Sequence, residues 1–115
     1  KEKVELLESL KGDGFKVACY TNSIKQTAHL MLSSTGVFHL FDMIITNQDV
    51  KLSKPDPEGY DYCVRSFGCT PNECLIVEDS PKGIEAAQKS GAHTLIVKSP
   101  DDVTKQNVYN RIGEL

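Results

Sequence analysis

The sequence has no long apolar run and no strong excess of charge of either sign. No stretch approaches the roughly 20 consecutive apolar residues that cross a bilayer, and residues 1–5 are too charged for a secretory signal. The net charge of −3 at pH 7 gives no reason to expect nucleic acid or an anionic membrane as a partner. We therefore expect a cytoplasmic protein in which local charges hold any anionic substrate.

The four cysteines and three histidines lack the spacings of a metal site. No two cysteines form a C-x-x-C pair, and no histidine lies four residues from another, so we do not expect a zinc site. Cys19, Cys63 and Cys74 fall in segments that favour strand or amphipathic helix. This placement favours reduced, buried thiols over disulfides.

Length and composition are those of a small globular domain. The chain has 115 residues, of which 39% are hydrophobic and 25% are charged. A domain of this size buries roughly two thirds of the surface that its unfolded chain exposes, and the sequence contains no repeats and no low-complexity linker. We therefore predict a single domain over residues 1–115.

Short apolar runs alternate with helical patterns along the chain. Apolar runs predict strands over residues 16–20, 41–46, 73–78 and 94–97, and apolar stripes predict helices over 1–11, 23–34, 57–67, 80–90 and a short stretch after 101. The strands are apolar throughout, which is typical of parallel strands covered on both faces. The order therefore predicts an α/β fold, a three-layer α/β/α sandwich with a mostly parallel, Rossmann-like sheet.

Capping residues mark the ends of two of these helices. Asp56 and Pro57 predict an N-cap followed by the first helical residue, and Ser80 and Pro81 predict the same arrangement later in the chain. Gly91 then predicts the end of that second helix.

Polar side chains follow each of the first three predicted strands. Thr21, Asn22 and Ser23 supply hydroxyl and amide groups at a helix N-terminus, which favours an anion such as phosphate, although helix capping alone also explains them. Lys54 follows the second strand in a loop fixed by prolines. A lysine there could neutralise a phosphoryl oxygen or an aspartate nucleophile, or simply face solvent.

Two carboxylates, Glu78 and Asp79, end the third predicted strand. Adjacent carboxylates repel each other unless a cation lies beside them, and Mg2+ is the obvious candidate. The alternative is that one acid caps the next helix while the other faces solvent. Because ligands of open parallel sheets bind outside the carboxyl ends of the strands, we expect Thr21, Lys54 and the two acids to lie around one phosphoryl-sized space.

Three segments of the chain, residues 17–23, 53–57 and 75–87, resemble the second, third and fourth motifs of the haloacid dehalogenase superfamily. The subgroup that they resemble most contains β-phosphoglucomutase and small-molecule phosphatases, and the resemblance extends from about residue 4 to residue 97.

The resemblance implies a role for each of these residues. Thr21, with Asn22 adjoining it, would hydrogen-bond the transferring phosphoryl group. Lys54 would stabilise the charge of the nucleophile and of the phosphoryl oxygens. Asp79 would bind Mg2+ directly or through water, and Glu78 would assist at the metal. Such enzymes take a phosphoryl group from a small phosphorylated metabolite through an aspartyl-phosphate and pass it to water or to a sugar hydroxyl.

The family's first motif, Asp-x-Asp-x-Thr after an N-terminal strand, has no match in the sequence. Its first aspartate is the nucleophile and its second is the acid/base, so we expect this chain alone to be inactive. The family's cap domain, which supplies most substrate contacts, has no counterpart either. Two explanations remain open: a fragment of a longer protein, or a natural product that has lost catalysis.

In the family's sheet, the strand that bears the first motif lies between the strands that end at Thr21 and Asp79. Its absence would expose two strand edges. We therefore predict that these strands pair directly with each other or recruit another chain or N-terminal segment.

Two other functions compete with the phosphoryl-transfer hypothesis. One is a non-catalytic phosphate- or protein-binding module derived from the same fold. The other is a phospho-receiver domain, which is disfavoured because the order of hydroxyl, lysine and acids does not match it.

Overall fold

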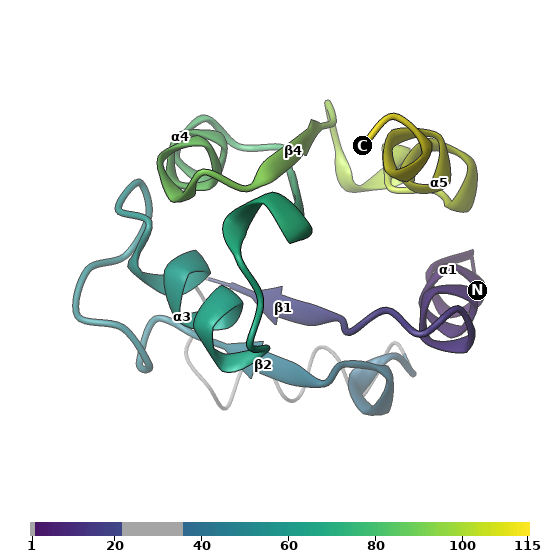
Figure 1. The fold of residues 1–115 in the computed structure, drawn as a ribbon, viewed down its shortest axis with the longest axis horizontal. Helices are drawn as coiled ribbons and strands as arrows, with labels where there is room; N and C mark the ends of the chain where they lie inside the picture. Colours follow the sequence, from purple (N-terminus) through teal and green to yellow (C-terminus); the bar gives the residue numbers. More distant parts are fainter. Residues whose placement is uncertain (1, 22–35) are drawn as a thin grey trace. The chain divides into compact units, whose positions relative to one another are not determined.

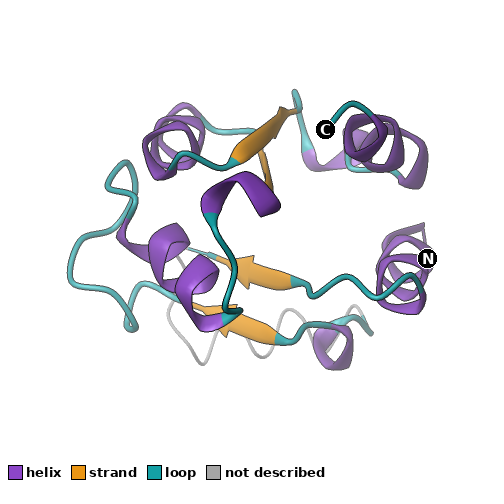
Figure 2. Ribbon diagram, in the orientation of Figure 1, coloured by secondary structure: helices purple, strands orange, loops and turns teal. Residues whose placement is uncertain are grey.

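In the computed structural model, residues 2–21 and 36–115 are described, and the chain divides into two compact units, Lys1–Lys51 and Leu52–Leu115. Figure 1 labels the helices and strands, and Figure 2 colours them by type. Each unit is an association of helices with a pair of parallel strands. The single domain expected over residues 1–115 stays a prediction.

The first unit contains α1 (Glu2–Gly12), β1 (Ala18–Tyr20), a 3-10 turn (Phe38–Leu40) and β2 (Met43–Ile45). Strands β1 and β2 are parallel, with Ala18 opposite Met43 and Tyr20 opposite Ile45. Leu6 and Leu7 are the buried residues of α1. The first helix and the first two strands are thus confirmed, although both strands are shorter than the apolar runs that predicted them.

Asp42 is the residue just before β2, and its carboxylate bonds both α1 and the residue that precedes β1. It accepts a hydrogen bond from the Val17 amide at 2.7 Å and another from the Lys11 ammonium. These two bonds, the one from Lys11 foremost, hold the pKa of Asp42 below its usual value.

A buried threonine follows β2. Thr46 is 1% exposed, and its amide and hydroxyl donate to Oδ2 of Asp49 at 2.8 and 3.1 Å. The Thr46 hydroxyl oxygen also accepts a bond from the Gln48 amide at 3.2 Å. These bonds satisfy the polar groups of a turn that would otherwise be costly to bury.

The second unit contains a complete strand, helix, strand crossover. Its elements are α3 (Glu58–Ser66), a 3-10 turn (Pro71–Glu73), β3 (Leu75–Glu78), α4 (Pro81–Ser90), β4 (His93–Ile96), a second 3-10 turn (Pro100–Asp102) and α5 (Lys105–Gly113). Strands β3 and β4 are parallel, from Leu75 opposite His93 to Glu78 opposite Ile96. Helix α4 contacts both strands and α3, and its Ala86 and Ala87 are 0% exposed.

Helix α4 begins and ends where its capping residues predict. Ser80 is the N-cap and accepts a bond from the Gly83 amide at 3.1 Å, Pro81 is the first helical residue, and Gly91 ends the helix with φ of 84°. That positive φ is a conformation which only glycine adopts readily.

The prediction for the start of α3 is wrong by one residue. Pro57, expected as the first helical residue, is the N-cap and has ψ of 2°, and the helix begins at Glu58. Asp56 Oδ1 accepts a bond from the Glu58 amide at 2.9 Å. A bond to the amide two residues on is the one that an N-cap side chain makes, so Asp56 still caps the start of α3 although the helix begins one residue later than predicted.

The fold class is confirmed as α/β with parallel strands, and the third and fourth strands and the last helix are also found. The helix predicted over residues 23–34 lies outside the described residues. Among the described residues, β1 pairs with β2 and β3 pairs with β4 in two separate two-stranded sheets. Since β1 and β3 belong to different units, direct pairing of these two strands and recruitment of another chain or segment both stay predictions.

Residues 2–21 and 36–115 include no helix with the length and apolar character that crossing a membrane requires. The four cysteines are free thiols, of which Cys63 is buried and the other three are half-buried. The expectation of buried thiols therefore holds for Cys63 alone.

Candidate functional site

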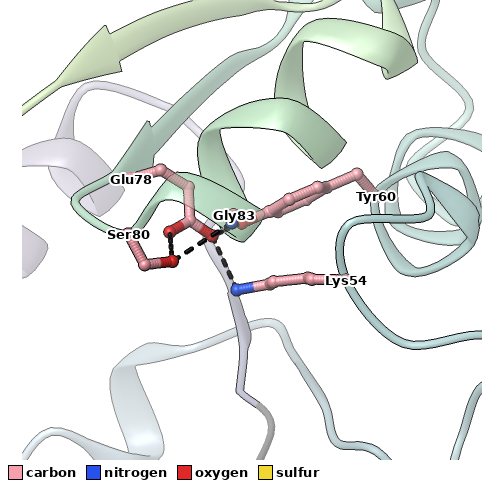
Figure 3. A network of polar contacts seen from close by, with 5 residues as sticks. All are labelled: Lys54, Tyr60, Glu78, Ser80 and Gly83. Atoms are coloured by element: carbon pink, nitrogen blue, oxygen red, sulfur yellow. Dashed lines mark hydrogen bonds and ion pairs between the residues drawn. The ribbon is translucent and has the colours of Figure 1, made fainter.

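A buried ion pair lies at the carboxyl end of β3 (Figure 3). Nζ of Lys54 is 2.6 Å from Oε2 of Glu78, and the two side chains are 9% and 8% exposed. Glu78 is the last residue of β3, and Lys54 precedes α3 in a loop where its peptide bond to Pro55 is cis. Since both charges are shielded from water, removing either one would leave the other buried and uncompensated.

Tyr60 contacts both members of this ion pair. Its hydroxyl donates a hydrogen bond to Oε2 of Glu78, the oxygen that Lys54 also contacts. Nζ of Lys54 lies 5.3 Å from the centroid of the Tyr60 ring, within the roughly 6 Å range of a cation–π interaction. Tyr60 comes from α3 and is buried, so the hydroxyl bond forms where water competes little.

The first turn of α4 completes the surroundings of the Glu78 carboxylate. The Ser80 hydroxyl donates to Oε1 of Glu78 at 3.5 Å. Gly83 approaches the same carboxylate so closely that a Cβ at this position would overlap both of its oxygens. A larger residue at this position would therefore require the Glu78 carboxylate to move, although the Gly83 backbone lies in an ordinary helix.

Asp79 follows Glu78 directly and is exposed. Since Oε2 of Glu78 already accepts bonds from Lys54 and Tyr60, Asp79 is the carboxylate of this pair that is open to a cation. In the described part of the chain, no group of three or more His, Cys, Asp or Glu residues could hold a metal ion. Mg2+ commonly takes one or two carboxylates together with waters and substrate phosphates, so Asp79 fits one such ligand position.

In the structure, Lys54 therefore contacts Glu78, and Asp79 is the exposed residue that follows Glu78. Glu78 contacts the lysine, and its predicted assistance at a metal stays a prediction. Thr21 belongs to the other unit, where it follows β1 and its amide donates to the Ile45 carbonyl at 3.0 Å. Asn22 lies outside the described residues. The expected approach of Thr21 to Lys54 and Asp79 stays a prediction.

Sequence reasoning missed two residues of this site, Tyr60 and Gly83. Tyr60 lies in the apolar stripe of the helix predicted over residues 57–67, where an aromatic residue is an ordinary core residue. Gly83 is the third residue of α4, a helix that is otherwise rich in residues with good helix propensity. Glycine in a helix is unfavourable by about 1 kcal/mol relative to alanine. This cost was the signal in the sequence that another group lies close to the backbone at Gly83.

Over most of its length, the chain is similar to known phosphatases. The sequence profile of the haloacid dehalogenase-like hydrolases matches residues 1–97. Pyrophosphatase PpaX of Bacillus velezensis is 33% identical over 90 residues, which cover 78% of this chain and 42% of that protein. Hexitol phosphatase A of Escherichia coli is 33% identical over 104 residues, or 90% of this chain and 48% of that protein.

The chain thus spans less than half the length of these curated relatives. Among solved structures, a phosphatase of the same superfamily from Thermococcus onnurineus superimposes with a TM-score of 0.85 at 26% identity, covering 97% of this chain and 57% of that one. The fold, the three motifs and the profile match over most of the sequence agree, and the chain belongs to the haloacid dehalogenase-like hydrolase family.

Proposed function

We propose that this chain forms part of a magnesium-dependent enzyme that transfers a phosphoryl group from a small phosphorylated metabolite through an aspartyl-phosphate. The observation that carries the proposal is the buried Lys54–Glu78 ion pair at the carboxyl end of β3. Ligands of parallel α/β sheets bind at this end of the strands. Two relatives are named as a pyrophosphatase and a hexitol phosphatase, and these names support phosphoryl transfer as the class of reaction.

Lys54 is the residue proposed to meet the developing charge. An ammonium carries three N–H donors, so its bond to Glu78 does not by itself prevent another to a phosphoryl oxygen or to the attacking carboxylate. Glu78 holds the ammonium in one place before substrate arrives, and such preorganised charge is a large source of rate enhancement. Thr21 is proposed to donate its hydroxyl hydrogen bond to the same phosphoryl group, with Asn22 adjoining it.

Asp79 is the proposed magnesium ligand, with Glu78 beside it. A magnesium ion bound there would neutralise charge on the phosphoryl oxygens. The exposed carboxylate of Asp79 at the end of β3 supports this role, because a single protein carboxylate leaves room for waters and phosphate oxygens around the ion.

The attacking aspartate is proposed to come from outside these 115 residues, because the sequence contains no Asp-x-Asp-x-Thr motif. A further segment of the protein or another chain would supply it. Within the described residues, β3 pairs only with β4. The other edge of β3 is where a strand carrying that aspartate would add to the sheet.

A chimera tests the proposal. This chain would replace the 104-residue stretch that it matches in Escherichia coli hexitol phosphatase A, and phosphate release from a panel of sugar phosphates would be measured with and without Mg2+. We expect magnesium-dependent release that Lys54→Met abolishes and that the exposed control Lys105→Met preserves. A folded chimera that releases no phosphate, or one that is equally active with Lys54→Met, would overturn the proposal.

The absence of the nucleophile motif also favours a second candidate, a non-catalytic phosphate- or protein-binding module. Orthophosphate would then shift the amide signals of Ser80 and its neighbours in the chain alone, with saturation, while the chimera would show no turnover. Turnover in the chimera would exclude this candidate.

A further inference from the structure

We propose that Tyr60 is a positioning residue that fixes the Lys54 ammonium, acting through Glu78 with its hydroxyl and directly with its ring. The importance of this role for catalysis rests on the proposed function, but the positioning itself is a property of the folded chain. The inference stands on three contacts within the second unit: the ion pair, the hydroxyl bond and the ring contact (Figure 3).

The ion pair alone does not determine how the Glu78 carboxylate is turned. The terminal torsion of a glutamate is broad, so the carboxylate can rotate while it stays close to a cation. Here Oε2 accepts from both Lys54 and Tyr60, and Oε1 faces the Ser80 hydroxyl. The Tyr60 hydroxyl therefore favours the orientation of the carboxylate in which one oxygen accepts bonds from both Tyr60 and Lys54.

The ring of Tyr60 restricts the ammonium as well. With Nζ 5.3 Å from the ring centroid and 2.6 Å from Oε2 of Glu78, the lysine head contacts an aromatic face and a carboxylate at once. Tyr60→Phe keeps the ring and removes the hydroxyl, so it separates the two contributions. Tyr62→Phe is the matched control, because Tyr62 is on the same helix and is 45% exposed.

A purely structural role for Tyr60 makes a different prediction. A buried tyrosine hydroxyl needs some acceptor, and any carbonyl could serve. In this site the acceptor is the charged group that holds Lys54, and hydrogen bonds to charged groups are about twice as strong as neutral ones. Loss of the hydroxyl should therefore change the behaviour of Lys54, whereas loss of a structural bond would only lower stability.

The test is an NMR measurement of the lysine ammonium groups in the full, isotope-labelled chain. In the unsubstituted chain and in Tyr62→Phe, we expect Lys54 to show restricted side-chain motion and slow exchange of its ammonium protons with water. In Tyr60→Phe, we expect that exchange to accelerate by roughly ten- to a hundredfold, the range that corresponds to loss of one hydrogen bond to a charged group. Glu78→Gln should accelerate it further. An unchanged Lys54 signal in a folded Tyr60→Phe chain would overturn the inference.

A second measurement decides the matter if Tyr60→Phe does not fold. In the unsubstituted chain, the Tyr60 hydroxyl proton should give a slowly exchanging signal with cross-peaks to the Lys54 side chain. If that proton exchanges freely or shows no such cross-peaks, the inference is wrong.

Phosphate release by the hexitol phosphatase A chimera separates this inference from the proposed function. We expect Tyr60→Phe to lower that release several-fold, with Tyr62→Phe unchanged. If the chimera releases no phosphate while the Lys54 ammonium still responds to Tyr60→Phe, the proposed function fails and the positioning role stands. If the chimera releases phosphate while the Lys54 ammonium is unchanged in Tyr60→Phe, the positioning role fails and the proposed function stands.

Discussion

Replacement of Gly83 by alanine would perturb the ion pair from α4 without touching either charged residue. A Cβ at Gly83 would overlap the carboxylate of Glu78. The carboxylate would have to move away, and its bonds with Lys54 and Tyr60 would lengthen or break. Gly83 is buried near the start of the helix, so the new methyl group has no easy route to solvent.

The size of the effect follows from two opposing contributions. Alanine is favoured over glycine in a helix by about 1 kcal/mol, whereas breaking a buried ion pair by removing one partner costs about 3–5 kcal/mol. Gly83→Ala displaces the carboxylate and removes neither charge, so the difference of about 2–4 kcal/mol is the upper limit of the expected loss in the free energy of unfolding. Gly113→Ala is the control, because a Cβ there meets nothing within 4 Å at the end of α5, and its effect should stay within about 0.5 kcal/mol.

Urea denaturation followed by circular dichroism measures these differences, and a double-mutant cycle identifies their cause. In a chain that already carries Glu78→Ala, there is no carboxylate to displace, so Gly83→Ala should cost nothing further and should recover the helical preference for alanine. The reasoning is refuted if Gly83→Ala is as stable as the unsubstituted chain, or if its cost is the same with and without Glu78.

Three further changes test other parts of the structure. Asp42→Asn should remove a contribution to folding stability of about 0.2–1 kcal/mol, the size expected for a surface ion pair. Because the Lys11 bond lowers the pKa of Asp42 in the folded state, this contribution is present above the ordinary aspartate pKa and is lost as the pH falls below it. Measurements of unfolding across acid pH, with exposed Asp101→Asn as the control, detect the difference. Ser80→Ala should lower the free energy of unfolding, measured by urea denaturation, by about 1 kcal/mol through loss of the α4 cap, and Ser80→Asn should retain most of that stability. Equal stability of Ser80→Ala and the unsubstituted chain would contradict the capping role. Thr46→Val should cost about 1–3 kcal/mol in the same assay because it strips bonds from a buried turn, and a neutral effect would argue against that network.

Local patterns were enough to predict most helices and strands and the order of the elements. The α4 helix is the clearest case, since Ser80, Pro81 and Gly91 act through contacts within a few residues of themselves. The start of α3 shows the limit of such rules, because Pro57 has ψ of 2° and the helix begins at Glu58, although the Asp56 side chain accepts a bond from the Glu58 amide as predicted for a cap. A competition between two local arrangements is decided by small energies that composition does not reveal.

Strand pairing was harder to predict than strand position. The apolar runs indicated parallel strands, and both observed pairs are parallel. For β1 and β3 the sequence leaves two outcomes open, direct pairing or recruitment of another chain or segment, and both stay predictions. An apolar run identifies a strand that needs covering, but not the neighbour that covers it, because many edges can satisfy the same backbone groups.

By itself, the sequence determined the fold class, the family and the candidate residues Lys54, Glu78 and Asp79, because motifs and periodicity are properties of neighbours along the chain. Only the tertiary structure decided that Glu78 contacts a lysine 24 residues away and that Tyr60 shares the same carboxylate oxygen. Those contacts depend on how α3 and α4 pack beside β3. A carboxylate's partner is set by three-dimensional proximity and burial, and neither is encoded in the spacing of residues.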